Sequence, residues 1–379
     1  MEFRDLKAQY QHLKPELDEE VLKVMKEGNF ISGYQVSELE KQLAEYVGVK
    51  HCITCGNGTD ALVLALMAWN IGKGDAVFVP DFTFFASAEA PAFLGATPVF
   101  VDVESRTFNI SPNELENAIQ GVLKEGKLIP KAIIAVDLFG QPAEYPRILE
   151  IAKKYNLFVL EDGAQGFGGG IGEKKACSFG DIATTSFFPA KPLGCYGDGG
   201  AIFTDNDDWA ELVKSYRIHG KGGNKYDNIR IGMNSRLDTM QAAILLVKLK
   251  AFVDHELHDV NTAADYYTSK LKNIVNTPII KEGYLSSWAQ YTIILDSKKQ
   301  RDELQNVLKE NGVPSMIYYP KQMHKQEAFH YVCRKEHSFK VTNELIDNVL
   351  ALPIHPYLTW EEQEKIINTI INFFENKSN

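Results

Sequence analysis

Short apolar segments alternate with helical segments through the first two thirds of the chain, and this alternation is the strongest constraint on its fold. Strands that alternate with helices are typical of a mostly parallel sheet covered by helices on both faces. Continuous apolar runs suit the buried strands of such a sheet. We therefore expect an α/β fold with strands at residues 76–79, 98–102, 131–136, 157–161, 182–186 and 201–204.

The pattern changes from about Leu237, where a long amphipathic helix and then a second one lead into another part of the chain. There we expect strands at residues 290–295 and 313–319 around a helix at residues 300–312. Thr359 and Glu362 have the spacing of a capping box, which predicts the start of a final helix. The sequence thus predicts a large α/β domain over residues 1–245 and a smaller C-terminal α+β domain over residues 246–379.

Composition and charge exclude several classes of partner. The chain has 379 residues and a formal net charge of −10, and it lacks the basic face that binding to nucleic acid or to a membrane surface requires. It has no signal peptide and no run long enough to span a bilayer, so we expect a cytoplasmic protein. Cys52 and Cys55 form a C-x-x-C pattern, for which a redox or zinc site is one interpretation. No second ligand pair follows, and we expect buried thiols and no metal.

Lys191 has an unusual setting for a lysine, because aromatic and apolar residues surround it in the run Phe187-Phe188-Pro189-Ala190-Lys191-Pro192-Leu193. Burial disfavours the charged ammonium form, so a lysine held there tends toward the neutral amine that attacks a carbonyl and forms a Schiff base. The carbonyl that suits this chemistry is that of pyridoxal phosphate. The alternative is a lysine whose stem covers apolar surface while its amine reaches water.

A glycine turn follows the strand expected to end at Cys55, in the run Gly56-Asn57-Gly58-Thr59-Asp60-Ala61. Its bare backbone N–H groups suit a phosphate at the start of the next helix, with a hydroxyl added by Thr59. The same run satisfies a relaxed dinucleotide fingerprint, in which Asp81 would bind a ribose, although Pro80 interrupts that strand exit. A third interpretation is a plain turn in which Thr59 or Asp60 caps the helix.

An acidic residue, Asp162, ends another apolar run, and a buried carboxylate needs a cationic partner. The protonated ring nitrogen of pyridoxal phosphate would be such a partner and would keep the ring electron-withdrawing. A structural salt bridge is the alternative. Gln165 is placed to contact the phenolic oxygen of the ring, and Phe84 to stack on the ring face, although an aromatic residue beside a strand end is often plain core.

A phosphate turn, a ring-nitrogen acid, a stacking aromatic and a Schiff-base lysine are together the set that a pyridoxal phosphate enzyme needs. On these residues the chain resembles the DegT/StrS-type sugar aminotransferases, which have the aspartate-aminotransferase-like fold, fold type I of pyridoxal phosphate enzymes. The resemblance is carried by residues 56–62, 81–87, 161–167, 178–191, 197–201, 232–242 and 352–356. It implies that Lys191 binds the cofactor covalently, that Asp162 contacts the ring nitrogen and that Gln165 contacts the ring oxygen.

The resemblance also implies how the cofactor phosphate is held. The turn at Gly58 and the side chains of Thr59, Asp60 and Ser186 would bind it within one subunit. Asn234 would reach the phosphate of the neighbouring subunit. A homodimer with shared active sites is therefore expected, a feature that the periodicity of the sequence alone does not predict.

The activity that the resemblance implies is transamination of a nucleotide-linked keto-sugar, with glutamate as amino donor, in polysaccharide or lipopolysaccharide biosynthesis. Residues 185–200 and 234–239 are most similar to the WbpE type, which aminates carbon 3 of a UDP-2-acetamido-hexuluronic acid. Arg236 would then hold the sugar carboxylate, although an ion pair with Asp238 is the alternative. The chain departs from this subgroup at Tyr318-Tyr319, where the subgroup has His-Tyr.

That departure leaves the sugar open. A 3-keto sugar without a carboxylate and amination at carbon 4 are both retained as alternatives. Basic residues at Lys221, Lys225 and Arg230 would suit the nucleotide diphosphate, although lysines in loops are usually only solvated. Two functions of other classes also remain: a nicotinamide oxidoreductase that uses the Gly56 turn, and a sugar-binding regulator without a cofactor.

Overall fold

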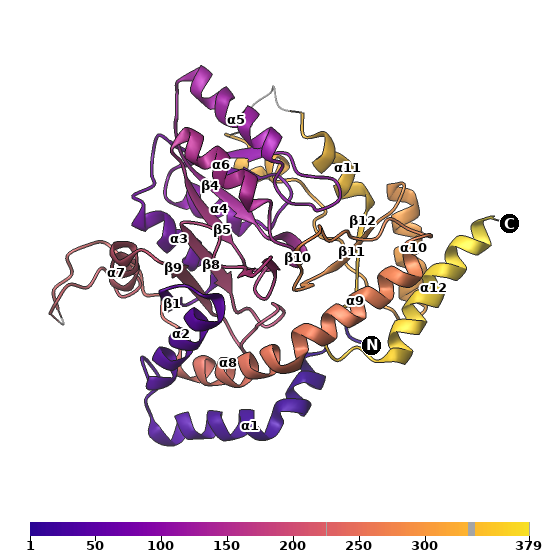
Figure 1. The fold of residues 1–379 in the computed structure, drawn as a ribbon, viewed down its shortest axis with the longest axis horizontal. Helices are drawn as coiled ribbons and strands as arrows, with labels where there is room; N and C mark the ends of the chain where they lie inside the picture. Colours follow the sequence, from indigo (N-terminus) through magenta and orange to yellow (C-terminus); the bar gives the residue numbers. More distant parts are fainter. Residues whose placement is uncertain (225, 333–337, 379) are drawn as a thin grey trace.

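The computed structural model describes residues 1–224, 226–332 and 338–378, and its centre is a seven-stranded sheet in the order β1-β9-β8-β5-β4-β2-β3 (Figure 1). Five neighbouring strands, from β8 to β3, run parallel, and β9 runs antiparallel to both β8 and β1. The mostly parallel α/β sheet predicted from the apolar segments is therefore confirmed. Its strands are β1 (His51–Cys55), β2 (Asp75–Pro80), β3 (Thr97–Val101), β4 (Ile129–Val136), β5 (Phe158–Asp162), β8 (Ile182–Ser186) and β9 (Gly200–Thr204).

Helices cover both faces of this sheet, because side chains of successive strand residues point to opposite faces. One face packs against α3 (Gly58–Ala68), α4 (Ala86–Phe93) and α7 (Asp207–Tyr216). The other face packs against α2 (Tyr34–Val47), α5 (Pro112–Glu125), α6 (Tyr145–Tyr155) and α8 (Thr239–Ala251). In β1, Cys55 belongs to the first core and Cys52 to the second, so the two thiols lie on opposite faces as free, buried groups. The expectation of buried thiols is confirmed.

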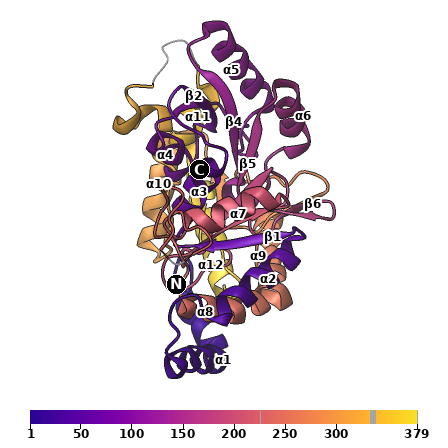
Figure 2. The same ribbon diagram turned by 90° about the vertical axis from the view of Figure 1, so that its left-hand side faces the viewer.

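The N-terminal helix α1 (Leu6–Glu27) lies outside these layers and packs on α8 through Leu13 and Leu17. Figure 2 shows α1 at one end of the molecule with α8 directly beside it. No helix in the described ranges combines the length and the apolar character that crossing a bilayer demands.

The C-terminal part is α+β. Its core combines an antiparallel pair of strands with three helices, and α11 covers its edge. These elements are β11 (Tyr291–Ile294), β12 (Val349–Leu352), α9 (Leu257–Leu271), α10 (Lys298–Glu310), α11 (Lys340–Asn348) and α12 (Trp360–Ser378). The predicted capping box is confirmed at the start of α12, where the backbone N–H of Thr359 and that of Glu362 each donate 3.2 Å bonds to the other residue's side chain.

A π-helical segment, Phe252–Glu256, joins α8 to α9 without a break. The predicted domain division after residue 245 falls inside α8 and stays a prediction. Short elements complete the described chain, namely a sheet of β6 (Gly170–Ile171), β7 (Lys174–Lys175) and β10 (Tyr284–Leu285), and 3-10 turns at Leu138–Gly140, Met323–Lys325 and Glu327–Phe329.

The predicted strand at residues 313–319 was wrong. Only Met316 forms a bridge, to Ala351, while β11 takes the later segment β12 as its full partner. After Met316 the chain does not continue alongside β12, and the Tyr319 hydroxyl accepts a hydrogen bond from Gln165, which follows β5 of the large sheet. The apolar, aromatic segment 313–319 therefore positions the Tyr319 side chain and does not add a strand to the sheet.

Candidate active site

The predicted residues Asp162 and Ser186 lie at the carboxyl ends of parallel strands, where ligands of open α/β sheets bind. β5 ends at Asp162 and β8 ends at Ser186. Gly200 of β9 pairs with Ser186 on one side and with Cys55 of β1 on the other. The end of β1 and its glycine turn therefore reach the same edge of the sheet as the acid and the lysine loop.

A tight loop after β8 carries Lys191. The backbone N–H of Lys191 donates to the Phe188 carbonyl at 2.8 Å, and that of Cys195 donates to the Phe187 carbonyl at the same distance. A β-carbon at Gly194 would lie 2.6 Å from two carbonyl oxygens of this loop, so the loop can close only over glycine. The closed loop fixes the backbone from which Lys191 projects.

The Lys191 amine has the setting that its predicted role requires. The side chain is half-buried, its Nζ lies 6.0 Å from the centroid of the Phe84 ring, and no hydrogen bond to Nζ occurs within the described residues. Burial lowers the pKa of Lys191, and the negative charge of Asp162 opposes this effect. The amine is thus shifted toward the neutral form that a nucleophile needs.

Asp162 is buried, with 5% of its surface exposed. The Ser87 hydroxyl donates to its Oδ2 at 2.7 Å, and the backbone N–H of Ala164 donates to Oδ1 at 3.3 Å. Burial raises the pKa of Asp162, whereas the Ser87 bond and the charge of Lys191 lower it. No lysine, arginine or histidine of the described chain forms an ion pair with this carboxylate, which disfavours a structural salt bridge. A buried acid without a cation fits the protonated ring nitrogen of pyridoxal phosphate.

Gln165 links the large sheet to the C-terminal part. Its Oε1 accepts from the backbone N–H of Phe139 at 2.8 Å, and its Nε2 donates to the Tyr319 hydroxyl at 3.0 Å. Burial raises the pKa of Tyr319, whose ring lies 6.3 Å from that of Phe84, centroid to centroid. Phe84 is 54% exposed, so it is not a core residue.

The glycine turn brings Gly58 and Ser186 into direct contact, since a β-carbon at Gly58 would lie only 2.7 Å from the β-carbon of Ser186. The cap of α3 is neither Thr59 nor Asp60, which the third interpretation proposed. The side chain of Asn57 instead accepts from the backbone N–H of Asp60 at 2.8 Å. With its start capped by Asn57 and with glycine at positions 56 and 58, α3 directs its N-terminal end at the site, an arrangement suited to phosphate.

The structure disfavours the dinucleotide interpretation of this turn. In a Rossmann fold the fingerprint strand lies centrally, whereas β1 is an edge strand that pairs antiparallel with β9 alone. Asp81, the proposed ribose ligand, is fully buried. Its Oδ2 lies 2.6 Å from Nδ1 of His324, and its Oδ1 accepts from the His324 backbone at 2.8 Å. That carboxylate is therefore occupied by a residue of the C-terminal part.

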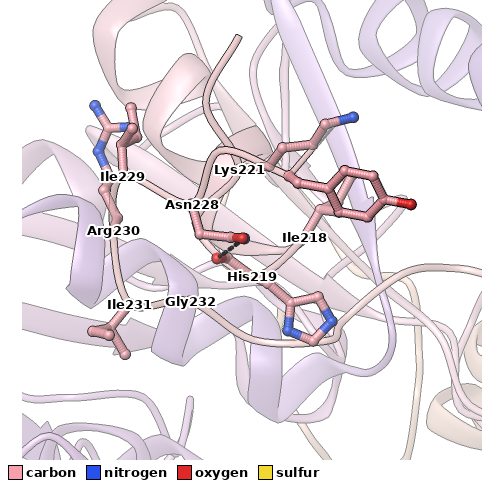
Figure 3. Close-up of a pocket in the computed structure, with 9 residues that line it drawn as sticks. Ile218, His219, Lys221, Asn228, Ile229, Arg230, Ile231 and Gly232 are labelled. Atoms are coloured by element: carbon pink, nitrogen blue, oxygen red, sulfur yellow. Dashed lines mark hydrogen bonds between the residues drawn. The ribbon is translucent and has the colours of Figure 1, made fainter. Parts of the chain in front are cut away.

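The predicted substrate residues Lys221 and Arg230 lie elsewhere, in a pocket of about 760 Å³ formed by the segment after α7 (Figure 3). Arg230 donates to the Ser215 hydroxyl at 3.2 Å, and Figure 3 shows the two cationic side chains pointing apart. None of the strand-end residues lines this pocket. Lys225, the third predicted cation, lies outside the described residues. The pocket is lined by Ile218, His219, Lys221, Tyr226, Asn228, Ile229, Arg230, Ile231 and Gly232.

Asn234 and Arg236 bind each other at the base of the same segment. The guanidinium of Arg236 donates to Oδ1 of the exposed Asn234 at 2.8 and 3.1 Å, and the alternative ion pair with Asp238 is not formed. Between them, Ser235 donates to Asp60 at 2.6 Å and accepts from the backbone N–H of Gly56 at 3.0 Å. The segment is therefore anchored on the glycine turn, while Asn234 itself faces outward.

Three contact residues of the site were missed by sequence reasoning. Ser87 stands in a run that the resemblance covers, and Asn57 is a residue type that commonly caps helices, so both had a signal in the sequence. Ser235 also stands in a run that the resemblance covers, but its contact with Asp60 joins segments far apart in the chain and had no local signal.

The sequence matches a known family over most of its length. The model described as the DegT/DnrJ/EryC1/StrS aminotransferase family matches residues 11–371. The UDP-2-acetamido-2-deoxy-3-oxo-D-glucuronate aminotransferase of Pseudomonas aeruginosa is 44% identical over 94% of this chain and 96% of its own length. The UDP-N-acetyl-3-dehydro-alpha-D-glucosamine 3-aminotransferase of Acidithiobacillus ferrooxidans is 39% identical over 97% and 96%.

Solved structures agree with these matches. A DegT/DnrJ/EryC1/StrS aminotransferase from Brucella abortus superposes with a TM-score of 0.96, at 48% identity and over 99% of both chains. A Bacillus subtilis structure, described with bound cofactor PMP, superposes with a TM-score of 0.88, at 28% identity and over 98% of this chain and 83% of that one. The predicted fold class is thereby confirmed.

Proposed function

The chain belongs to the DegT/DnrJ/EryC1/StrS aminotransferase family, whose members use pyridoxal phosphate, and on this premise we propose that it transfers the amino group of glutamate to a nucleotide-linked keto-sugar. The observation that carries the proposal is the pairing of a neutral-leaning amine, Lys191, with a buried acid that lacks a cation, Asp162. A sugar-binding regulator without a cofactor would have no use for such a pair.

When bound, pyridoxal phosphate supplies an electron sink for the carbanion formed at the donor α-carbon. We assign Lys191 to hold the cofactor covalently. Once released, its Nζ would take the α-proton of glutamate and pass it to the carbon of the cofactor that had carried the aldehyde, and it would move a proton in the reverse direction in the half-reaction with the keto-sugar. A lowered pKa suits both tasks, because a base works best with a pKa near the operating pH. Asp162 would keep the ring nitrogen protonated, and Gln165 would contact the ring oxygen.

The remaining cofactor contacts follow from the positions of the side chains. Phe84, exposed beside the lysine amine, would cover a ring face. The start of α3 would bind the phosphate through the N–H groups of its glycine turn. We assign Gly58, Thr59, Asp60 and Ser186 to this phosphate site.

For the acceptor we propose a UDP-linked 3-keto-2-acetamido sugar or its uronic acid, aminated at carbon 3. The names of the Pseudomonas and Acidithiobacillus relatives support carbon 3, one with a carboxylate on the sugar and one without. Tyr318 and Tyr319 bring no positive charge to the site, and the Tyr319 hydroxyl already accepts from Gln165, which favours the sugar without a carboxylate. Arg236 remains the candidate ligand for a carboxylate, and carbon 4 remains the alternative position.

We also propose a homodimer with shared active sites. Lys221, Arg230 and Asn234 lie on a segment whose pocket includes no strand-end residue, so they would act on the site of a second subunit. There the two cations would meet the nucleotide diphosphate and Asn234 the cofactor phosphate. The net charge of −10 and the free buried thiols suit a cytoplasmic enzyme of polysaccharide or lipopolysaccharide biosynthesis, with no nucleic-acid or membrane partner.

The test is an acceptor panel. Purified protein is incubated with glutamate and with 3-keto and 4-keto UDP- and dTDP-sugars, with and without a carboxylate at carbon 6, while 2-oxoglutarate is measured. We expect product with a UDP-linked 3-keto sugar, and NMR should locate the new amine at carbon 3. Turnover of a 4-keto sugar alone would contradict the proposed position, and no turnover of any keto-sugar would contradict the substrate class.

A further inference from the structure

The side chain of Arg4 donates hydrogen bonds to the backbone of the loop that carries Lys191, called the lysine loop here. Its Nη2 donates to the carbonyl of Lys191 at 2.8 Å and to that of Pro192 at 3.3 Å. The first residues of the chain thus reach the loop on which the proposed catalytic amine is mounted.

Two neighbours of Arg4 fix this N-terminal segment. Asp5 caps α1 by accepting from the backbone N–H of Ala8 at 2.8 Å, which sets the direction in which the chain enters the helix. The ring of Phe3 packs edge-on against Tyr318, with 6.2 Å between centroids. The segment therefore touches the lysine loop and the tyrosine pair together, and Arg4 is held rather than free to swing.

The positive charge of Arg4 is not neutralised by a direct ion pair with any described residue. Glu256 is the carboxylate that acts on it, but its Oε1 accepts from Gln9 at 2.8 Å and from Tyr357 at 2.7 Å. Burial lowers the pKa of Arg4 to about 10, and its charge contributes to lowering the pKa values of Lys248 and His355. The guanidinium is thus a half-buried cation whose charge acts on neighbouring groups.

Lys191 is one of these neighbours. Besides burial, the groups that act on the pKa of its amine are Asp162, which raises it, and Arg4, which lowers it. A like charge nearby disfavours the charged form, so Arg4 and burial act in the same direction. The carbonyl contacts hold the main chain of Lys191, and the charge biases the protonation of its amine.

We propose that Arg4 is a positioning residue for transamination, which holds the main chain of Lys191 and places a positive charge near its amine. This inference rests on the proposed role of Lys191. It assigns to the N-terminal segment a part in the reaction that neither the glycine turn nor the strand ends supply.

Three variants separate the charge from the hydrogen bonds. Arg4→Gln keeps a donor but removes the charge, and Arg4→Lys keeps the charge with fewer donors. Lys7→Gln removes a charge from the same segment at an exposed side chain, whose nearest carboxylate is Glu2 at 3.9 Å, and is the matched control. The readout is the pH titration of the visible absorption of the holoenzyme, which reports the protonation of the nitrogen contributed by Lys191.

We expect Arg4→Gln to raise this pKa, because a nearby like charge is removed, and to lower kcat more than it changes KM. Arg4→Lys should stay close to the native pKa, as should Lys7→Gln. A native titration curve for Arg4→Gln would overturn the inference, and so would an equal shift in Arg4→Lys. Thermal unfolding confirms that each variant is folded, and should Arg4→Gln fail to fold, Arg4→Lys still tests whether the charge sets the pKa.

A different variant shows whether the proposed function itself is wrong. In that case Lys191→Ala would retain the visible absorption of the native holoenzyme. If Lys191→Ala loses that absorption while Arg4→Gln leaves the titration unchanged, the inference on Arg4 fails alone.

Discussion

Removal of the Ser87 hydroxyl should weaken catalysis through Asp162. The Ser87 hydroxyl donates to Asp162 at 2.7 Å, both residues are buried, and it is the shorter of the two hydrogen bonds that the carboxylate accepts. A hydrogen bond to a charged group contributes about 1.5 to 3 kcal/mol. At about 1.4 kcal/mol for each factor of ten, Ser87→Ala should lower kcat/KM for glutamate roughly 10- to 100-fold.

The sign of the pH effect also follows from the structure. The Ser87 bond lowers the pKa of Asp162, so its loss should raise that pKa and move the acidic limb of the kcat profile to higher pH. Ser37→Ala is the control, because that hydroxyl is exposed and donates only to the Tyr34 carbonyl within its own helix. The reasoning is refuted if Ser87→Ala keeps the native kcat/KM and the native acidic limb.

Three further changes have defined outcomes. Gly58→Ala should weaken the binding of pyridoxal phosphate to the apoenzyme at least about tenfold, since the added methyl group would lie 2.7 Å from the β-carbon of Ser186. Fluorescence titration of the apoenzyme measures this affinity, and a native affinity would contradict the phosphate assignment. Burial raises the pKa of Glu161 to about 7 and also raises the pKa of Asp137. The folded state therefore binds more protons than the unfolded state in this range, so the free energy of unfolding should fall by about 1 to 3 kcal/mol from pH 5 to pH 8. Asp137→Asn should flatten this dependence in urea titrations, and an unchanged slope would refute it. Arg230→Ala should raise KM for the nucleotide sugar about tenfold and leave the glutamate half-reaction unchanged in stopped-flow spectra; an equal loss in both would contradict a diphosphate role.

The parallel sheet could be predicted because buried strands must be short and apolar. Residues 76–79 and 182–186 lie within strands of the structure for that reason. The same criterion failed at residues 313–319, where the aromatic run places Tyr319 against Gln165. A hydrophobic pattern predicts that a segment is buried. It does not tell whether the segment is a strand of a sheet or an irregular segment that contacts the site.

Two functional side chains could be predicted from their residue type and their apolar neighbours alone. An acid after a buried strand and a lysine among aromatic residues each suggest a partner, and the structure places Asp162 and Lys191 at the same edge of the sheet. Among the supporting contacts, those of Ser235 and Arg4 were not predictable, because they join segments remote in sequence. Arg4 reaches Lys191 across 187 positions, and no local pattern marks such a pair.

The measurement that tests the account most directly is the location of the covalently held cofactor. Native holoenzyme is reduced with borohydride, digested, and analysed by mass spectrometry for the added pyridoxyl group. The account predicts one modified peptide, with the group on Lys191, and none in a Lys191→Ala digest. A pyridoxyl group on another lysine, or none in the native protein, would contradict it.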